Sequence, residues 1–242
     1  MLSELTATRF WLDLAEITGI NIMLSGDNAV VIALACRSLP LRQRNWAVIG
    51  GSAGAILLRV LFCLVIVWLL RVPYLKLIGG LLLLWIGVKL IVPEDGDGEG
   101  GLSAKSNLFG AMQTIMIADA VMSLDNVVAI AAVARDSVLL IVLGLVISVP
   151  LIVFGSQLVL RFLVRFPLLV TLGGGLLGWI AGEIITGDDA VERWVPAAQF
   201  HTLEQVAQPV LAVLVMAIGT LLARRAASRP KEVADLASEE RK

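Results

Sequence analysis

Two Asp-Asn pairs stand inside long apolar stretches of this 242-residue chain. The pairs are Asp27-Asn28 and Asp125-Asn126, and another carboxylate, Asp119, precedes the second pair by six residues. An Asp at the centre of a membrane helix costs about 2.5–3.5 kcal/mol on insertion scales, so it must face a cavity, a partner charge or an ion. Carboxylate and amide oxygens suit hard or borderline cations such as Mn²⁺, Ca²⁺ and Mg²⁺. These five residues are therefore the predicted ligands of an intramembrane cation site, and hydrogen bonding between helices is the alternative reading of them.

The two pairs belong to an internal repeat. Aligning 21–37 with 119–135, a shift of 98, gives seven identical positions out of 17, including both Asp and both Asn of the pairs. The repeated unit is about three helices long. Because three is odd, the second copy enters the membrane from the opposite side, as in the inverted repeats of many secondary transporters, whose sites lie at the repeat interface.

Seven further residues are candidates for gating the site or for supporting its ligands. They are Asn21, Ser25, Gly26, Arg59, Ser123, Glu16 and Glu183. Residues at i, i+4 and i+7 share one helix face, which groups Asn21, Ser25 and Asn28 in the first copy and Asp119, Ser123 and Asn126 in the second. Gly26 predicts a break in the first helix, as in many transporter sites.

Three of these candidates are charged, and each has two readings. Arg59, in the middle of the second apolar stretch, is either a static ion-pair partner or a cation that pairs with an Asp until a metal displaces it. Glu16 and Glu183 stand near predicted outer ends of spans. Each either lines an exit path or carries a coupling proton, or it is a solvated helix end.

The composition is that of a membrane protein. Apolar residues make up 58% of the chain and charged residues 16%, against about 25% charged in soluble domains. These values exclude a typical soluble enzyme, a nucleic-acid binder and a disordered chain. Seven apolar runs are each long enough for a span, which needs about 20 residues. They cover 10–36, 46–70, 74–92, 108–134, 138–160, 168–186 and 205–223.

The expected fold is an all-α membrane protein with seven transmembrane helices, arranged as an inverted repeat of 3+3 helices plus one extra C-terminal helix. The expected units are listed here by residue number: the first three-helix repeat 1–92, an acidic Gly-rich cytoplasmic linker 93–107, the second, inverted repeat 108–186, an outer loop 187–204, the seventh helix 205–225 and a cytoplasmic tail 226–242. The single His, His201, is expected in the loop.

Basic residues set the expected orientation, because Lys and Arg concentrate in cytoplasmic flanks. With the amino end outside, the inner flanks hold ten: Arg37, Arg42, Arg44, Lys105, Arg161, Arg165, Arg224, Arg225, Arg229 and Lys231. The outer flanks hold five: Arg9, Arg71, Lys76, Arg135 and Arg193. Ten against five predicts the amino end outside and the carboxyl end in the cytoplasm, which agrees with an odd number of spans.

Two segments carry a resemblance to a known family. LSGDNAVVIALA (24–35) and ADAVMSLDNVVAIAAVA (118–134) resemble the paired signatures of the TerC family of integral membrane proteins, within the LysE-type transporter grouping. The match runs from about residue 10 to 223. The resemblance implies seven spans, a substrate site at the two Asp-Asn pairs with Asp119, and a role in metal homeostasis, chiefly manganese export. The family name records tellurium resistance.

Together these observations predict an exporter of a divalent metal cation, with Mn²⁺ as first candidate, in a bacterial cytoplasmic membrane. It would work by alternating access and would not be an enzyme. Mn²⁺ would be the transported substrate, with no tightly bound cofactor. The expected partners are the lipid bilayer, the metal ion, and protons as counter-ion; an oligomer is compatible with the sequence and a nucleic-acid partner is not expected.

Three alternatives use the same residues differently. The first is export of another small solute or ion, such as an amino acid. The second is a non-transporting membrane scaffold linked to metal or tellurium resistance. The third, an intramembrane aspartyl protease, fits poorly because Leu24 stands where that motif has an extra Gly before Gly26, and no Tyr precedes Asp125.

Overall fold

Helices form all of the regular structure in the described part of the chain. The computed structural model describes residues 8–24, 26–69, 72–92, 101–134 and 138–227. The helices are α2 (Thr8–Leu24), α3 (Asn28–Cys36), α4 (Leu41–Leu69), α5 (Leu75–Ile91), α6 (Gly101–Ala134), α7 (Val138–Arg165), α8 (Leu168–Thr186), α9 (Asp189–Trp194) and α10 (Ala197–Ala227). Each of the seven predicted apolar runs falls on one or two of them, so the chain is an all-α membrane protein.

Length and composition mark several of these helices as membrane spans. Four are long and apolar enough to cross a bilayer, namely Arg42–Val65, Leu139–Arg165, Leu168–Thr186 and Thr202–Ala227. The bent pair Phe10–Met23 and Asn28–Cys36 makes a fifth if it is counted as one span. Two other predicted spans fall on shorter apolar helices, α5 with 17 residues and the stretch Leu108–Leu124 of α6.

Some boundaries differ from those expected. Helix α6 begins at Gly101, so its first turns lie within the segment 93–107 that we predicted as a linker. The predicted outer loop 187–204 contains α9 and the first turns of α10. His201 is therefore helical, where we expected a loop. We predicted these segments as linker or loop because they contain polar residues, but a helix can begin in the polar flank of a span.

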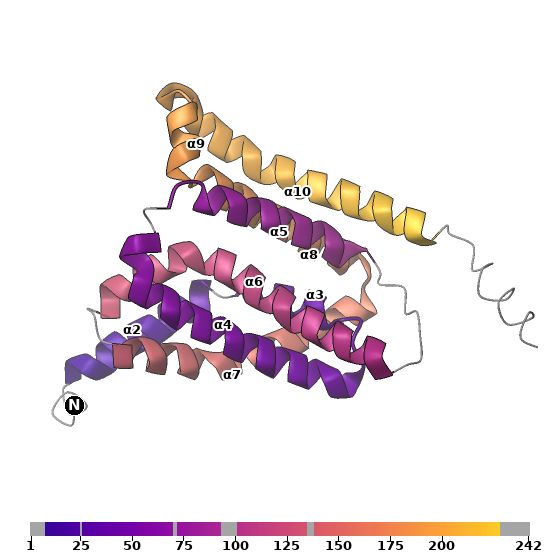
Figure 1. Cartoon of the computed structure of the whole chain (residues 1–242), viewed down its shortest axis with the longest axis horizontal. Coiled ribbons are helices and arrows are strands. Elements are labelled where there is room, and N and C mark those ends of the chain that lie inside the picture. The colour runs from indigo at the N-terminus through magenta and orange to yellow at the C-terminus, as the bar shows by residue number, and fades with distance from the viewer. Residues whose placement is uncertain (1–7, 25, 70–71, 93–100, 135–137, 228–242) are drawn as a thin grey trace, which may run out of the picture.

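The helices form two layers (Figure 1). One layer contains α5, α8 and α10, which pack along one another. In the other layer α4 packs on α6, and α7 packs on both α2 and α3. An apolar cluster joins the layers, with buried side chains that include Leu34 of α3, Val121 of α6, and Leu83 and Leu177 of α5 and α8. Helix α10 lies on the outside of its layer, away from the Asp-Asn pairs.

The first span is broken where Gly26 predicted a break. Helices α2 and α3 meet at an angle of 53° around residues 25–27. Asp27 caps the second piece, since its side chain accepts a hydrogen bond from the Asn28 backbone N–H at 2.9 Å, a role in which Asp is favoured. Helix α6, in contrast, runs without a break from Gly101 to Ala134, so the two copies of the repeat differ here.

Glycines allow α8 and α10 to pack with their backbones close together. A Cβ added at Gly178 would lie 2.6 Å from the Leu211 carbonyl oxygen, and one at Gly182 would lie 2.8 Å from the Gln208 Cα. Backbone atoms cannot move aside as a flexible side chain can. The four-residue spacing of these glycines is the small-residue pattern by which membrane helices approach closely.

Replacing Gly178 with Ala is therefore expected to destabilise the protein, because the added methyl group forces α8 and α10 apart. Overpacking of this kind costs roughly 1–3 kcal/mol. Thermal unfolding of the purified protein in detergent should show a lowered midpoint. Gly110→Ala is the matched control, since nothing lies within 4 Å of a Cβ at Gly110. Equal midpoints for the two variants would contradict the close packing.

Candidate functional site

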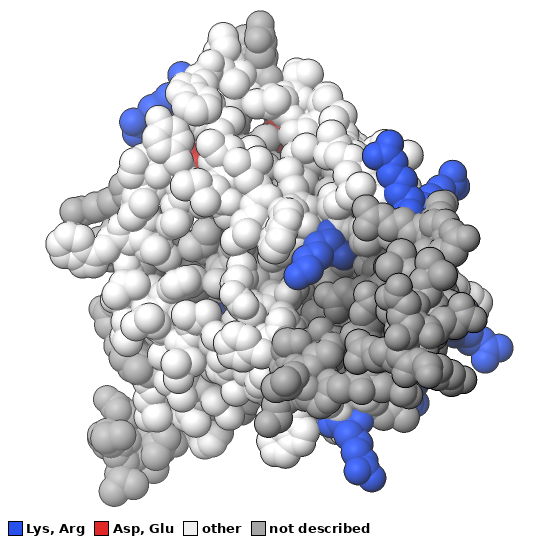
Figure 2. Space-filling model, turned by 45° about the vertical axis from the view of Figure 1, so that its right-hand side comes forward, with Lys and Arg blue, Asp and Glu red and all other residues white. Residues whose placement is uncertain are grey.

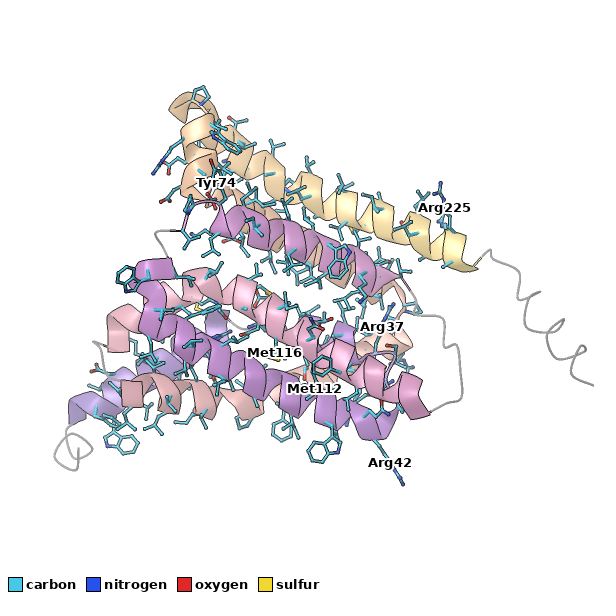
Figure 3. All side chains as sticks on the ribbon, viewed as in Figure 1. Arg37, Arg42, Tyr74, Met112, Met116 and Arg225 are labelled. Atoms are coloured by element: carbon cyan, nitrogen blue, oxygen red, sulfur yellow. The ribbon has the colours of Figure 1, made fainter. Side chains whose placement is uncertain are left out.

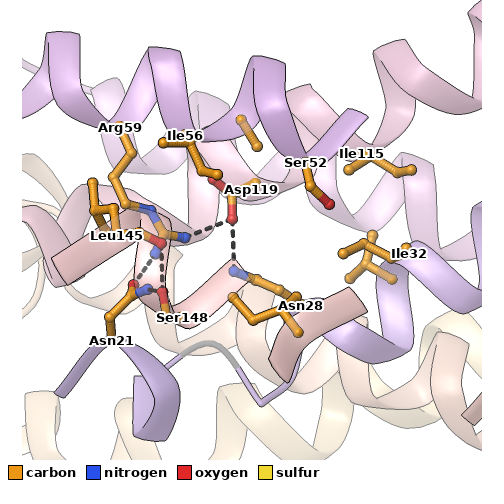
Figure 4. A pocket seen from close by; sticks show the side chains of 13 residues that line it. Asn21, Asn28, Ile32, Ser52, Ile56, Arg59, Ile115, Asp119, Leu145 and Ser148 are labelled. Carbon is orange, nitrogen blue, oxygen red and sulfur yellow. Dashed lines mark hydrogen bonds and ion pairs between the residues drawn. The ribbon is translucent and has the colours of Figure 1, made fainter. Parts of the chain in front are cut away.

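A small internal cavity lies where α2, α3, α4, α6 and α7 converge (Figure 4). Its volume is about 30 Å³, on a scale where one water molecule needs roughly 10–15 Å³. The cavity therefore has room for one or two waters or a small ion. The polar side chains that line it are Asn21, Asn28, Ser52, Arg59, Asp119 and Ser148.

The Asp119 carboxylate is the centre of this group. Asp119 is only 9% exposed. Its Oδ1 accepts hydrogen bonds from Asn28 Nδ2 and from Arg59 Nη2, each at 2.6 Å, and its Oδ2 accepts one from Ser123 Oγ at 3.2 Å. The carboxylate thus receives donors from α3, α4 and its own helix. Such charge-assisted bonds are the stronger kind in proteins.

Arg59 connects this carboxylate to the far side of the cavity. Its side chain is 3% exposed and forms an ion pair with Asp119. Its Nε donates to Ser123 Oγ at 2.9 Å, and its Nη1 donates to Asn21 Oδ1. Asn21 Nδ2 in turn donates to Ser148 Oγ on α7. One hydrogen-bonded network therefore crosses the broken first span, α4, α6 and α7.

Two oxygen atoms at the cavity wall take no part in this network. Asn28 Oδ1 and Ser52 Oγ are buried and have no hydrogen-bond partner in the described part of the chain. Buried polar atoms are almost always paired with protein or ordered water, so an unpaired one needs an explanation. Both atoms belong to residues that line the cavity. They are the positions at which a bound ion or water would complete the site.

Apolar side chains close the cavity along the helix axes in both directions. Toward the start of α2 and α7 the cavity is lined by Leu145, a member of a buried cluster that also contains Ile17. Toward the end of α3 it is lined by Ile32 and Ile115, which belong to a second buried cluster. A solute that approaches Asp119 along the helix axes from either end meets one of these clusters.

Of the five predicted ligands, the structure brings Asn28 and Asp119 together. Asp27 is half-buried beside Asn28 but faces its own helix start and does not line the cavity. Asn126 is likewise half-buried and outside the lining. Asp125 lies in α6, but its side chain is outside the described residues. Among the described residues, no group of three His, Cys, Asp or Glu side chains is placed to hold a metal.

The seven supporting candidates divide clearly. Asn21, Arg59 and Ser123 are all in the hydrogen-bonded network, and Gly26 lies at the break between α2 and α3. Glu16 and Glu183 are exposed and do not line the cavity. Ser25 lies outside the described residues.

Sequence reasoning missed Ser52 and Ser148, which face the cavity from α4 and α7. A signal for them exists, because the two serines stand 96 residues apart, as do Ile56 and Ile152, which also line the cavity. A shift of 96, two less than the shift of the Asp-Asn pairs, would have aligned the second helices of the two copies. Counted along the sequence, the stretch from the Asp-Asn pair to the cavity-lining serine is therefore two residues shorter in the second copy.

Removing Arg59 should destabilise the protein more than removing the whole ion pair. In Arg59→Met the Asp119 carboxylate stays buried without its cation, and breaking a buried pair in this way costs about 3–5 kcal/mol. Arg59→Met/Asp119→Leu removes both charges and should recover much of the loss. Thermal unfolding of the single and double variants measures this coupling, with exposed Arg193→Met as control. Strictly additive effects would contradict the pairing.

This chain is similar to known proteins over almost its whole length. The family model described as "Integral membrane protein TerC family" matches residues 6–231. "Uncharacterized membrane protein YjbE" of Bacillus subtilis (strain 168) is 37% identical over 212 residues, which is 88% of this chain and 95% of the relative. "UPF0053 inner membrane protein YgdQ" of Escherichia coli (strain K12) is 29% identical over 179 residues, 67% and 75% of the two chains. No solved structure matches the chain.

Proposed function

The chain belongs to the TerC family of integral membrane proteins. We propose that it exports a divalent metal cation across the cytoplasmic membrane, with Mn²⁺ as the first candidate. One observation carries this proposal. A buried carboxylate, Asp119, lines a small cavity beside two oxygen atoms that have no partner among the described residues, Asn28 Oδ1 and Ser52 Oγ. Carboxylate, amide and hydroxyl oxygens together are a donor set for a hard or borderline cation. Mn²⁺ is here the transported substrate, so the chain acts as a carrier and not as an enzyme.

Arg59 takes the place of the cargo when the carrier is empty. Its guanidinium neutralises Asp119 inside the membrane, where an unpaired carboxylate is costly. A divalent ion that binds Asp119 repels the guanidinium and displaces it. After the ion leaves, Arg59 pairs with Asp119 again, so the empty carrier can return to its inward-facing state without an unpaired buried charge. Protons are the proposed counter-ion for this return step.

The break in the first span gives the remaining ligands a route to the ion. Asp27 is adjacent to Asn28 and lies at the junction of α2 and α3. A rotation at Gly26 brings its carboxylate toward the cavity without unwinding either helix. Asp125 and Asn126 follow Ser123 on α6 by two and three residues, and they complete the proposed ligand set from the second copy.

The packing supports an inverted repeat of 3+3 helices, followed by α10 as a seventh span. Helix α2 packs on α7 as α6 packs on α4, and α5 packs on its counterpart α8. In the first contact Ile17 fills the space at Gly144, and in the second Ile115 fills the space at Gly51. These two isoleucines are 98 residues apart, the shift of the Asp-Asn pairs. In this arrangement the cavity lies at the repeat interface, where secondary transporters bind their substrates.

Mn²⁺ flux should depend on Asp119. In proteoliposomes that contain Asp119→Asn we expect Mn²⁺ transport to fall by roughly tenfold or more, since even groups that only support metal ligands cost 10–100-fold when removed. The variant keeps the side-chain shape but loses the charge that holds the ion. Glu192→Gln is the matched control, because Glu192 is exposed and does not line the cavity.

Two results would overturn the proposal. One is undiminished Mn²⁺ flux through Asp119→Asn. The other is the lack of any flux above empty liposomes with folded wild-type protein, which would favour a non-transporting scaffold. Mg²⁺, Ca²⁺ and amino acids belong in the assay as competitors, because strong competition by one of them would change the proposed cargo.

The proposed topology places the amino end outside and the carboxyl end in the cytoplasm. Both native cysteines, Cys36 and Cys63, are buried and can be replaced by Ala to give a cysteine-free background. Glu192→Cys is then expected to react with a membrane-impermeant maleimide in intact cells. Arg42→Cys, also at an exposed position, is expected to react only after the membrane is opened. The reverse pattern would invert the proposed orientation.

A further inference from the structure

A groove separate from the cavity opens between α4 and α7, with α3 as its floor. Its volume is about 350 Å³. The helices place it next to the cavity: Cys36, Val48 and Ser156 of the groove stand four residues from Ile32, Ser52 and Ile152 of the cavity, listed in the same order. The groove therefore lies one helical turn, about 5.4 Å, farther toward the end of α3.

The polar part of the groove is basic. Arg44 and Arg161 line it together with Asn45, Ser156 and Gln157, and none of the described residues that line it is acidic. Arg44 is held in place, since its Nε donates to the Leu39 carbonyl at 2.7 Å and its Nη2 donates to the Arg37 carbonyl at 2.9 Å. A fixed guanidinium loses less freedom on binding an anion than a mobile side chain does.

The rest of the groove is apolar, and so is the exposed surface of α4 and α7 beside it. Ala33, Cys36, Val48, Leu160 and Val164 line its depth. Large apolar side chains on the outer surfaces of the same two helices are exposed, among them Trp46 and Ile49 on α4 and Leu158 and Phe162 on α7. The groove thus has a cationic side and an apolar side, as an amphipathic ligand requires.

The groove lies at the basic end of the molecule. Figure 3 places Arg37, Arg42 and Arg225 at this end, opposite Tyr74. Figure 2 turns this end toward the viewer and shows Lys and Arg side chains around it, with very little Asp or Glu in view among the residues that are not drawn grey. Basic residues gather at the cytoplasmic side of membrane proteins, so the groove lies at the level of the inner-leaflet headgroups.

We propose that this groove binds one anionic glycerophospholipid, with its phosphate between Arg44 and Arg161 and the start of an acyl chain on the apolar floor. Basic pockets between helices on the cytoplasmic side bind anionic headgroups in other membrane proteins. Guanidinium groups bind phosphate through paired hydrogen bonds. A soluble phosphate would satisfy the arginines but would leave the apolar floor uncovered. The proposal rests on the proposed orientation, with this end of the molecule at the cytoplasmic face, and is independent of what the chain transports.

Native mass spectrometry of the purified full-length protein tests the proposal. The protein is titrated with phosphatidylglycerol, with the zwitterionic phosphatidylcholine, and with inorganic phosphate. We expect one phosphatidylglycerol to bind in preference to phosphatidylcholine, and Arg161→Gln to weaken that binding about fivefold. Arg161 is exposed, so its replacement should leave the fold intact. Arg225→Gln is the matched control, since Arg225 is exposed at the same end but outside the groove.

A second variant separates the groove from a general effect of basic charge. Val164→Trp keeps both arginines and fills the groove, so it should also weaken phosphatidylglycerol binding. Equal losses in Arg225→Gln and Arg161→Gln would overturn the proposal, as would unchanged binding in both groove variants. Inorganic phosphate that binds as tightly as the lipid, and competes with it, would also overturn it by showing a soluble-anion site.

Discussion

The buried ion pair between Arg59 and Asp119 is the interaction on which the arrangement of the site layer depends. Neither charge is tolerable alone inside a membrane, so α4 and α6 must approach at these two residues. Glycines make that approach sterically possible, because Met112, Ile115 and Met116 of α6 fill the spaces at Gly50, Gly51 and Gly54 of α4. The pair then recruits Asn21 and Ser148 and so fixes α2 and α7 around it. The cavity is the space left between the helices that these contacts hold together.

The sequence predicted the kind of protein and the helices that carry the site, because both follow from local signals. Apolar runs located the helices, the shift of 98 paired Asn28 with Asn126 and Asp119 with Asn21, and Gly26 marked the break. Partners across helices could not be predicted in the same way. That Arg59 meets Asp119, and that Ser52 and Ser148 face the same cavity, depends on how far each helix is rotated and displaced. Those quantities are set by the side chains that pack at glycines, and a repeat in the sequence relates equivalent positions without showing which residues meet.

The two layers have different physical characters. In one, α8 lies with its backbone against that of α10, and such contact leaves little room for sliding. In the other, the helices meet through a polar network whose donors and acceptors can exchange partners. The apolar cluster between the layers, with Leu34 and Val121 on one side and Leu83 and Leu177 on the other, has no directional bonds to break among those side chains. Directional bonds between the layers do occur elsewhere, since Arg37 Nη2 donates to the Ile91 and Val92 carbonyls at the end of α5.

The break between α2 and α3, which α6 does not repeat, bears on how the two halves have diverged since their common origin. A gene duplication produces two equal halves, and both would at first have had the same freedom to bend. Here the first half has Gly26 where the second has Leu124. The first copy has a break between two helices, and the second has one unbroken helix that contains Asp119. The two copies thus keep related helix contacts, while only the first has a bent span.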